Sequence, residues 1–136
     1  KTEVYEGGHR VPLIVSWPGR IEAGTTGTLT HSNDWMPTIL ALAGSESPNS
    51  DGADMSSFLL EGTDLAPRPL FWRTRNAYAV RKGPWKLCVI EKQPQLFHLE
   101  NDPGETTNLA KDNKELVTEL SNAWSAWNED VNASTK

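Results

Sequence analysis

The sequence predicts an α+β fold, and three observations lead to this class. An almost continuous apolar run lies near the start of the chain, short strand patterns separated by turn residues fill the middle, and apolar residues at helical spacing come near the end. Strands that follow one another closely pair as an antiparallel meander. With 136 residues, of which 37% are hydrophobic and 23% charged, the chain is globular in composition and can bury a modest core.

The first predicted strand covers residues 11–17 and ends at Pro18-Gly19. A nearly unbroken apolar run is typical of a strand covered on both faces, as in a mixed or parallel sheet surrounded by helices. A helix is then expected over 34–43, with Asp34 as a favourable N-cap and Gly44 as the C-terminal stop. We expect this helix to flank the strand over 11–17.

The rest of the chain reads as a loop region followed by a meander and a helix. Residues 45–69 are predicted to form loops around one short helical turn near 55–60. Strands are then expected over 70–73, 77–81, 85–90 and 95–99. The last element is predicted as a helix over 113–128, with Leu116, Leu120, Trp124 and Trp127 on one face.

Charge and composition exclude several classes of partner. The net charge of −5 argues against a nucleic acid, which requires a basic face. No apolar run approaches the roughly 18 residues needed to cross a bilayer, so no membrane partner is expected. His9, His31 and His98 lie too far apart for a zinc-type cluster. The single cysteine, Cys88, is expected to be a buried and inert thiol.

The opening segment carries the most specific pattern in the chain, Lys1-x-x-x-Tyr5-Glu6-Gly7-Gly8-x-Arg10-Val11-Pro12, followed by Trp17-Pro18-Gly19. This pattern resembles the second signature region of the formylglycine-dependent sulfatases, the arylsulfatase family of the alkaline-phosphatase superfamily. Later segments resemble the same family in order and spacing, including Asp34-x-Met36-Pro37-Thr38, Ala79-Val80-Arg81-x-Gly83-x-Trp85-Lys86-Leu87 and Asp102-Pro103-x-Glu105. The resemblance covers essentially the whole chain.

The resemblance implies that the chain is the C-terminal part of a sulfatase. Residues 1–66 would end the catalytic α/β domain, contributing one or two strands and a helix of its large mixed sheet. Residues 67–136 would form a small subdomain of about four antiparallel strands packed with a terminal helix. The family nucleophile, a Cys or Ser oxidised to formylglycine, has no match here, because Cys88 lies outside the required Cys/Ser-x-Pro/Ala-x-Arg pattern. The family's calcium ligands would lie upstream of Lys1, so we expect this chain alone to bind no metal tightly and to be inactive.

Three residues of the opening segment are candidate site residues. The resemblance implies that Lys1 contacts the sulfate of the substrate, where an ammonium would offset negative charge in the transition state. His9 either faces the pocket and touches substrate or packs at the turn. Arg10 either binds sulfate or holds the Gly7-Gly8 turn through an ion pair, with Glu6 as its expected partner. The two glycines are expected to allow close backbone approach or a positive φ.

By the same resemblance the parent protein hydrolyses a sulfated carbohydrate or an aryl sulfate and is periplasmic, secreted or lysosomal. Two alternatives stay open. One is a phosphonate or phosphate monoester hydrolase of the same superfamily, because a lysine suits phosphate equally well. The other is a non-catalytic glycan-binding or docking module, suggested by the six tryptophans, with Trp124 and Trp127 on the final helix. Arg73 and Arg75 are candidates for contacting an anionic glycan.

The strand over 11–17 also carries a prediction about partners. An apolar strand with unpaired edges is prone to association. We therefore expect this strand to pair with the missing N-terminal part of the protein, or to mediate self-association.

Overall fold

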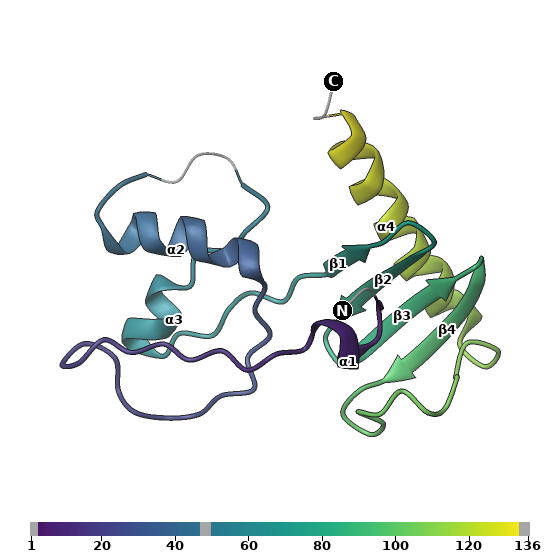
Figure 1. Ribbon diagram of the computed structural model, residues 1–136, viewed down its shortest axis with the longest axis horizontal. Coiled ribbons are helices and arrows are strands. Elements are labelled where there is room, and N and C mark those ends of the chain that lie inside the picture. The colour runs from purple at the N-terminus through teal and green to yellow at the C-terminus, as the bar shows by residue number, and fades with distance from the viewer. Residues whose placement is uncertain (1–2, 47–49, 134–136) are drawn as a thin grey trace. The chain divides into compact units, whose positions relative to one another are not determined.

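The computed structural model describes residues 3–46 and 50–133. The chain divides into two compact units, one made of residues 13–66 and the other made of the opening segment, up to Pro12, together with the chain from Pro67 onward. Figure 1 labels the elements of both units. The predicted division at residue 66 refers to the parent enzyme and stays a prediction.

The unit that follows Pro67 is built on a four-stranded sheet. Its strands are β1 (Leu70–Arg73), β2 (Ala77–Lys82), β3 (Trp85–Ile90) and β4 (Gln93–His98). They lie in the order β1-β2-β3-β4, and every neighbouring pair is antiparallel. The predicted α+β class, the small meander and the terminal helix are therefore confirmed.

Both faces of this sheet are buried, because successive side chains of a strand point to opposite faces. On one face, Val4 of the opening segment packs against Ala79 and Cys88. On the other face, Leu120 packs against Val80 and Leu87. The double burial explains why β3 is apolar at both odd and even positions.

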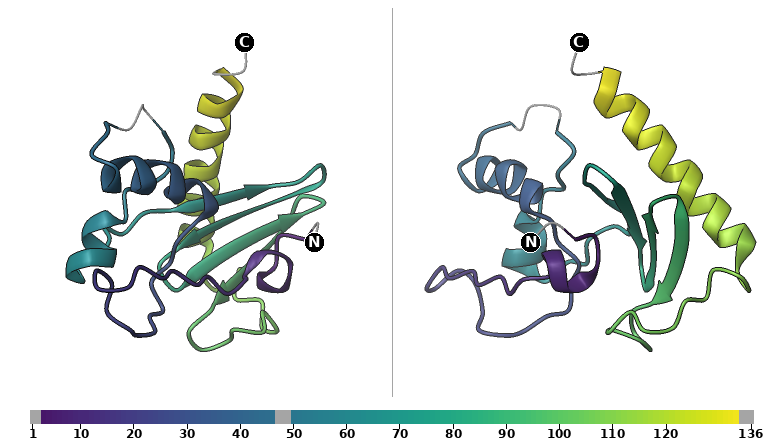
Figure 2. Two further views of the ribbon diagram at one scale, coloured as in Figure 1. Left: turned by 60° about the vertical axis from the view of Figure 1, so that its left-hand side comes forward. Right: turned by 45° about the vertical axis from the view of Figure 1, so that its right-hand side comes forward.

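Helix α4 (Lys114–Ala133) covers the second of these faces, as Figure 2 shows. Trp124 stacks on Tyr78 with 4.0 Å between ring centroids, and Trp127 stacks on Phe71 at 5.0 Å. Stacked rings at this distance are stabilising packing contacts. The two tryptophans that suggested a glycan-binding surface thus pack on the sheet.

Truncation of Leu120 provides a test of this packing. We expect Leu120→Ala to lower the free energy of unfolding of the chain by about 2–5 kcal/mol, because Leu120 is fully buried and its removal leaves a cavity. Urea denaturation would measure the change. Asn122→Ala on the exposed side of the same helix is the control and should change stability by less than about 0.5 kcal/mol. Equal effects of the two substitutions would show that α4 is not firmly packed.

The unit of residues 13–66 contains η1 (Ser32–Asp34), α2 (Trp35–Leu42) and α3 (Ser56–Glu61). The helix predicted over 34–43 is therefore present, and Gly44 follows it with a φ of +73°. Asp34 is buried: its Oδ2 accepts the backbone N–H of His31 at 2.7 Å, and its Oδ1 accepts that of Ala53 at 2.9 Å. Asp34 occupies the N-cap position of α2, as predicted, but its side chain makes no capping hydrogen bond to that helix; it takes part in the capping box of η1 and holds the loop that leads to α3.

The prediction of a strand over residues 11–17 is wrong for this chain. These residues form no strand, and Val11 and Ile14 are 74% and 90% exposed. A strand requires a neighbour for its backbone N–H and C=O groups, and within the described ranges the four strands pair only with one another. The expected packing of α2 on that strand is consequently not observed.

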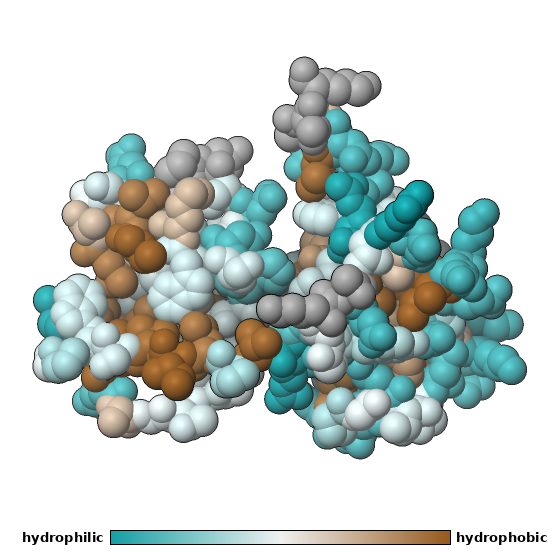
Figure 3. All heavy atoms as spheres, viewed as in Figure 1, coloured by the Kyte–Doolittle hydropathy of each residue, from teal (hydrophilic) through white to brown (hydrophobic). Residues whose placement is uncertain are grey.

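The unit of residues 13–66 also exposes apolar side chains in a group, which Figure 3 shows as brown spheres. The large apolar side chains exposed in this unit are Leu13, Ile14, Trp17, Met36 and Ile39. Among the described helices, none combines the length and the apolar character needed to span a membrane.

Candidate functional site

The opening segment enters the sheet unit through Val4 and then forms a short helix, α1 (Glu6–His9). The sequence did not predict this helix, because two consecutive glycines are poor helix formers. A β-carbon on Gly8 would lie only 2.3 Å from the carbonyl oxygen of Glu3, whereas one on Gly7 would meet nothing within 4 Å. The expectation of close backbone approach therefore holds for Gly8 and not for Gly7.

This difference gives a matched pair of substitutions. Gly8→Ala should lower the free energy of unfolding by about 1–3 kcal/mol, because backbone must move to admit the methyl group. Gly7→Ala should cause no loss, since it lies in open space and alanine favours a helix. Thermal or urea unfolding of both variants would measure the effect. A Gly7→Ala variant as unstable as Gly8→Ala would contradict the described turn.

A buried ion cluster lies where α1 meets the sheet, and sequence reasoning missed it. Lys86 of β3 is 0% exposed, and its Nζ lies 2.9 Å from Oε1 of Glu6 and 2.9 Å from Oε1 of Glu105. Arg81 Nη1 lies 3.1 Å from Oε2 of Glu6. Two carboxylates thus face two cations, which is the condition for keeping charges buried. One feature of the sequence could have pointed to this cluster: Glu6, Lys86 and Glu105 each lie in a segment that resembles the sulfatase family.

Glu105 holds the start of α1 in two ways. Its Oε2 accepts the backbone N–H of Glu6 at 2.6 Å, and its Oε1 binds the ammonium that also binds the side chain of Glu6. Glu105 has a φ of +54°, an uncommon conformation for a residue with a side chain. The turn after β4 is therefore shaped to aim this carboxylate at the opening segment.

The charges of the cluster set the ionisation of its members. Burial alone would raise the pKa of Glu6, but the hydrogen bond and charge of Lys86, together with Arg81, bring this pKa below its usual value. Glu6 is therefore ionised at neutral pH. Burial raises the pKa of the neighbouring Cys88 thiol to about 12, which is consistent with the expected buried, unreactive cysteine.

The first predicted site residue, Lys1, lies outside the described residues. The second, His9, packs with its ring on Trp72, with 4.2 Å between centroids and 17° between planes. Its Nε2 lies 3.1 Å from the carbonyl oxygen of Val4 and 3.1 Å from Nζ of Lys86. The ring edge that carries Nε2 thus faces the cluster, in line with the packing alternative. A substrate contact by His9 stays a prediction.

The third predicted site residue, Arg10, makes the expected ion pair. Its Nη1 lies 3.9 Å from Oε2 of Glu6, while its side chain is 65% exposed. A long, exposed pair of this kind contributes little stability. Glu6 is therefore held mainly by Lys86 and Arg81, and a sulfate-binding role for Arg10 stays a prediction.

His9 gives the unit a predicted pH response. Burial and the charge of Lys86 lower the pKa of His9 below the value of about 6.5 that it has when unfolded. The unfolded state therefore binds more protons, so stability is complete above pH ~6.5 and falls as the pH drops. We expect His9→Gln to flatten the dependence of unfolding free energy on pH between about 5.5 and 7, measured by urea titrations. Equal slopes for the wild type and for His9→Gln would contradict the prediction.

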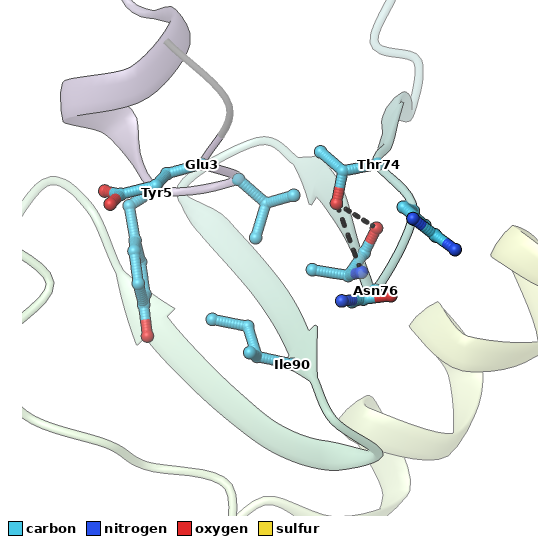
Figure 4. Close-up of a pocket in the computed structure, with 8 residues that line it drawn as sticks. Glu3, Tyr5, Thr74, Asn76 and Ile90 are labelled. Atoms are coloured by element: carbon cyan, nitrogen blue, oxygen red, sulfur yellow. Dashed lines mark hydrogen bonds between the residues drawn. The ribbon is translucent and has the colours of Figure 1, made fainter.

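A groove of about 630 Å³ runs between the opening segment and the turn that joins β1 to β2. Figure 4 shows Glu3 and Tyr5 on one side of it and Thr74 and Asn76 on the other. Arg75 also lines the groove, and no hydrogen bond or ion pair joins it to another described residue. Arg73 differs, because its Nη1 donates to Asn128 at 2.6 Å and to Asn132 at 3.1 Å. Of the two arginines, only Arg75 therefore keeps its guanidinium available to a ligand.

No metal centre is found in residues 3–46 and 50–133. These residues contain no group of three or more His, Cys, Asp or Glu side chains placed to hold a metal ion. The described side chains consequently do not fit a calcium ion.

Comparison with known proteins identifies the family. Residues 1–129 match the family described as "N-sulphoglucosamine sulphohydrolase, C-terminal". The chain belongs to this family and corresponds to the C-terminal region of sulfatases, which confirms the resemblance seen in the sequence.

Two relatives illustrate the match. The chain is 36% identical to arylsulfatase A of Homo sapiens over 141 residues, which cover 80% of this chain and 28% of that protein. It is 31% identical to an N-acetylgalactosamine-6-O-sulfatase of Bacteroides thetaiotaomicron over 141 residues, covering 89% of this chain and 28% of that protein. The chain thus spans less than a third of the length of these relatives.

Solved structures share the fold. A Bacteroides thetaiotaomicron structure, described in connection with the metabolism of multiple glycosaminoglycans, superposes with a TM-score of 0.83 at 27% identity, covering 93% of this chain and 30% of that one. The structure named Ps i-CgsB superposes with a TM-score of 0.74 at 29% identity, covering 82% of this chain and 27% of that one.

Proposed function

We propose that the full-length protein is a sulfuric ester hydrolase, and that this chain supplies a sulfate-contacting lysine and part of the substrate-binding surface. The match to the C-terminal sulfatase family over residues 1–129 carries this proposal. Lys1 stands where the family pattern has the lysine that contacts sulfate. A compact ammonium there would stabilise negative charge that develops on the sulfate oxygens.

The formylglycine nucleophile and a calcium ion are proposed to come from the part of the protein that precedes Lys1 in the family pattern. There, the formylglycine residue would supply the attacking oxygen and a bound calcium ion would supply the Lewis acid. Because the described residues do not fit a calcium ion, no step assigned to this chain passes through the metal. Its proposed part is to bind the sulfate and the organic group to which the sulfate is attached.

A sulfated carbohydrate is the proposed substrate, with an aryl sulfate as the simpler analogue. One relative is named an N-acetylgalactosamine-6-O-sulfatase, and a solved relative at 30% identity and a TM-score of 0.61 is described in complex with k-i-k-neocarrahexaose. The groove offers chemistry that suits a charged sugar: the Arg75 guanidinium, the Asn76 amide and the Thr74 hydroxyl. Glu3 and Tyr5 of the opening segment line the same groove, so we assign the groove to the sugar portion of the substrate.

The proposal also explains the exposed apolar side chains of residues 11–17. We propose that the upstream part of the protein covers residues 11–17 and provides the missing strand partners. Pairing would satisfy their backbone groups and remove exposed apolar surface from water. A periplasmic, secreted or lysosomal location is proposed from the kinds of sulfatase to which the chain is related.

The test is an assay of the full-length protein with calcium present, on an aryl sulfate, a sulfated oligosaccharide and a phosphate monoester. Release of sulfate from the first two substrates is the expected result, and the 136-residue chain alone should be inactive. Hydrolysis of the phosphate ester alone would favour the phosphatase alternative. Binding of sulfated oligosaccharides without turnover, followed by tryptophan fluorescence, would favour a glycan-binding module.

A further inference from the structure

The buried ion cluster joins segments that lie far apart in the sequence. Lys86 comes from the middle of β3, Glu105 from the turn beyond β4, and Glu6 from the first turn of α1. The ammonium of Lys86 lies at 2.9 Å from a carboxylate oxygen of each glutamate. The sheet therefore holds the opening segment through three charged groups that solvent barely reaches.

The arrangement restrains both the backbone and the side chain of Glu6. Glu105 accepts the backbone N–H of Glu6, while Lys86 and Arg81 bind the two oxygens of its carboxylate. Immediately before α1, Val4 is buried against the same face of the sheet. The close contact of Gly8 with Glu3 then leaves the turn no room to expand. The opening segment is thus held at Val4, at Glu6 and at Gly8.

Such a cluster is an inefficient way to gain stability alone. Taking charges out of water costs free energy that their attraction only partly returns, and apolar side chains of similar size are often as stable. A buried charged network of this kind favours one geometry, because a displaced carboxylate would lose its close contacts with Lys86. The cluster is therefore suited to fixing a position.

We propose that Lys86 and Glu105 are positioning residues for sulfate ester hydrolysis. They hold Glu6, and with it the described part of the opening segment from Glu3 onward, and through that segment they would act on the sulfate contact proposed for Lys1. The inference rests on the proposed function of the full-length protein. Neither residue is assigned a contact with substrate, since Lys86 is fully buried and its partners occupy it.

The test is a double-mutant cycle in the full-length protein, measured as kcat/KM and kcat on an aryl sulfate. Lys86→Met removes the shared cation, and Glu105→Gln keeps the shape and one acceptor for the Glu6 N–H while removing the charge. Each is made in the wild type and in a Lys1→Ala background. We expect each to lower kcat/KM about 10- to 100-fold in the wild type, because small misplacement of a reacting group is costly. In the Lys1→Ala background the same substitution should change kcat/KM less than about twofold, since residues that act through one another are not additive.

Lys82→Met is the matched control for both backgrounds. Lys82 pairs with Glu119 at 2.7 Å on the surface, where the two side chains are 57% and 54% exposed. Its loss should leave kcat/KM unchanged within about twofold in either background.

The outcomes separate the positioning role from mere structural support. A full additional loss from Glu105→Gln in the Lys1→Ala background would overturn the proposal, as would a lowered melting temperature with unchanged kcat/KM in the wild type. Should Lys86→Met fail to fold, the Glu105→Gln arm decides alone. Failure of the proposed function has a different signature, namely the absence of sulfate ester hydrolysis by the wild-type protein.

Discussion

Replacing Lys1 with alanine in the full-length protein is expected to lower kcat/KM for a sulfate ester about 100- to 1,000-fold. This is the size of effect seen when one fixed group that stabilises transition-state charge is removed. The expectation follows from the proposed sulfate contact of Lys1, in a segment whose continuation is anchored by Glu6. The loss should appear mainly in kcat, because the negative charge on the sulfate oxygens, which the Lys1 ammonium is proposed to stabilise, is greatest in the transition state.

Two comparisons make this result specific. Thr2→Ala, the adjacent position and a variable one in the pattern, should leave kcat/KM unchanged within about twofold. Inhibition by inorganic sulfate should weaken in Lys1→Ala and not in Thr2→Ala, since the product anion loses the same ammonium. A loss of less than tenfold in Lys1→Ala would remove Lys1 from the set of catalytic residues.

The sheet and the terminal helix were predictable because local sequence determines them. The β3 strand was predicted over 85–90 and is observed as Trp85–Ile90, bounded on one side by Gly83 with a φ of +58°. Helix α4 was predicted from the spacing of Leu116, Leu120, Trp124 and Trp127, and it extends a few residues beyond the predicted end. Alternation and helical spacing are read within a few neighbouring residues, so no distant contact is required.

The prediction of a strand over residues 11–17 was wrong because this element depends on distant neighbours rather than on local sequence. Its apolar pattern describes a buried environment, but burial of a strand depends on neighbours supplied from elsewhere. Within the part of the chain that the structure describes, that neighbour is lacking, and Ile14 is left 90% exposed. The pattern was informative about the proposed parent enzyme and misleading about the isolated chain.

The ion cluster could not be found from sequence pattern alone. Lys86 occupies one position in an alternating strand, where a lysine ordinarily marks a solvent-facing side chain. Its burial depends on Glu6 and Glu105, which are 80 and 19 residues away along the chain, and no local rule pairs them. His9 was a candidate for either packing or substrate contact, and its stacking on Trp72 likewise depends on how the opening segment docks on the sheet.

The second large effect concerns stability. Lys86→Met is expected to lower the free energy of unfolding of the chain by about 3–5 kcal/mol at pH 7, because it leaves Glu6 and Glu105 buried beside each other without their shared cation. Combining it with Glu6→Gln and Glu105→Gln should recover most of that loss, since the uncompensated charges disappear. Urea denaturation would measure all three proteins. Lys82→Met, whose partner is exposed, should change stability by less than about 1 kcal/mol.

The dependence on pH distinguishes this electrostatic account from a simple packing defect. In the wild type the pKa of Glu6 is lowered, so the stability it contributes is present above its unfolded pKa of about 4.3 and is lost as the pH falls. Without Lys86, the effect of burial on the pKa of Glu6 is no longer offset by the charge of that lysine, so protonation of Glu6 should reduce the destabilisation of the variant as the pH falls. The gap in unfolding free energy between wild type and Lys86→Met should therefore narrow from pH 7 toward pH 4. A gap that stays constant over this range would mean that the lost packing of the lysine stem, rather than the stranded charges, causes the instability.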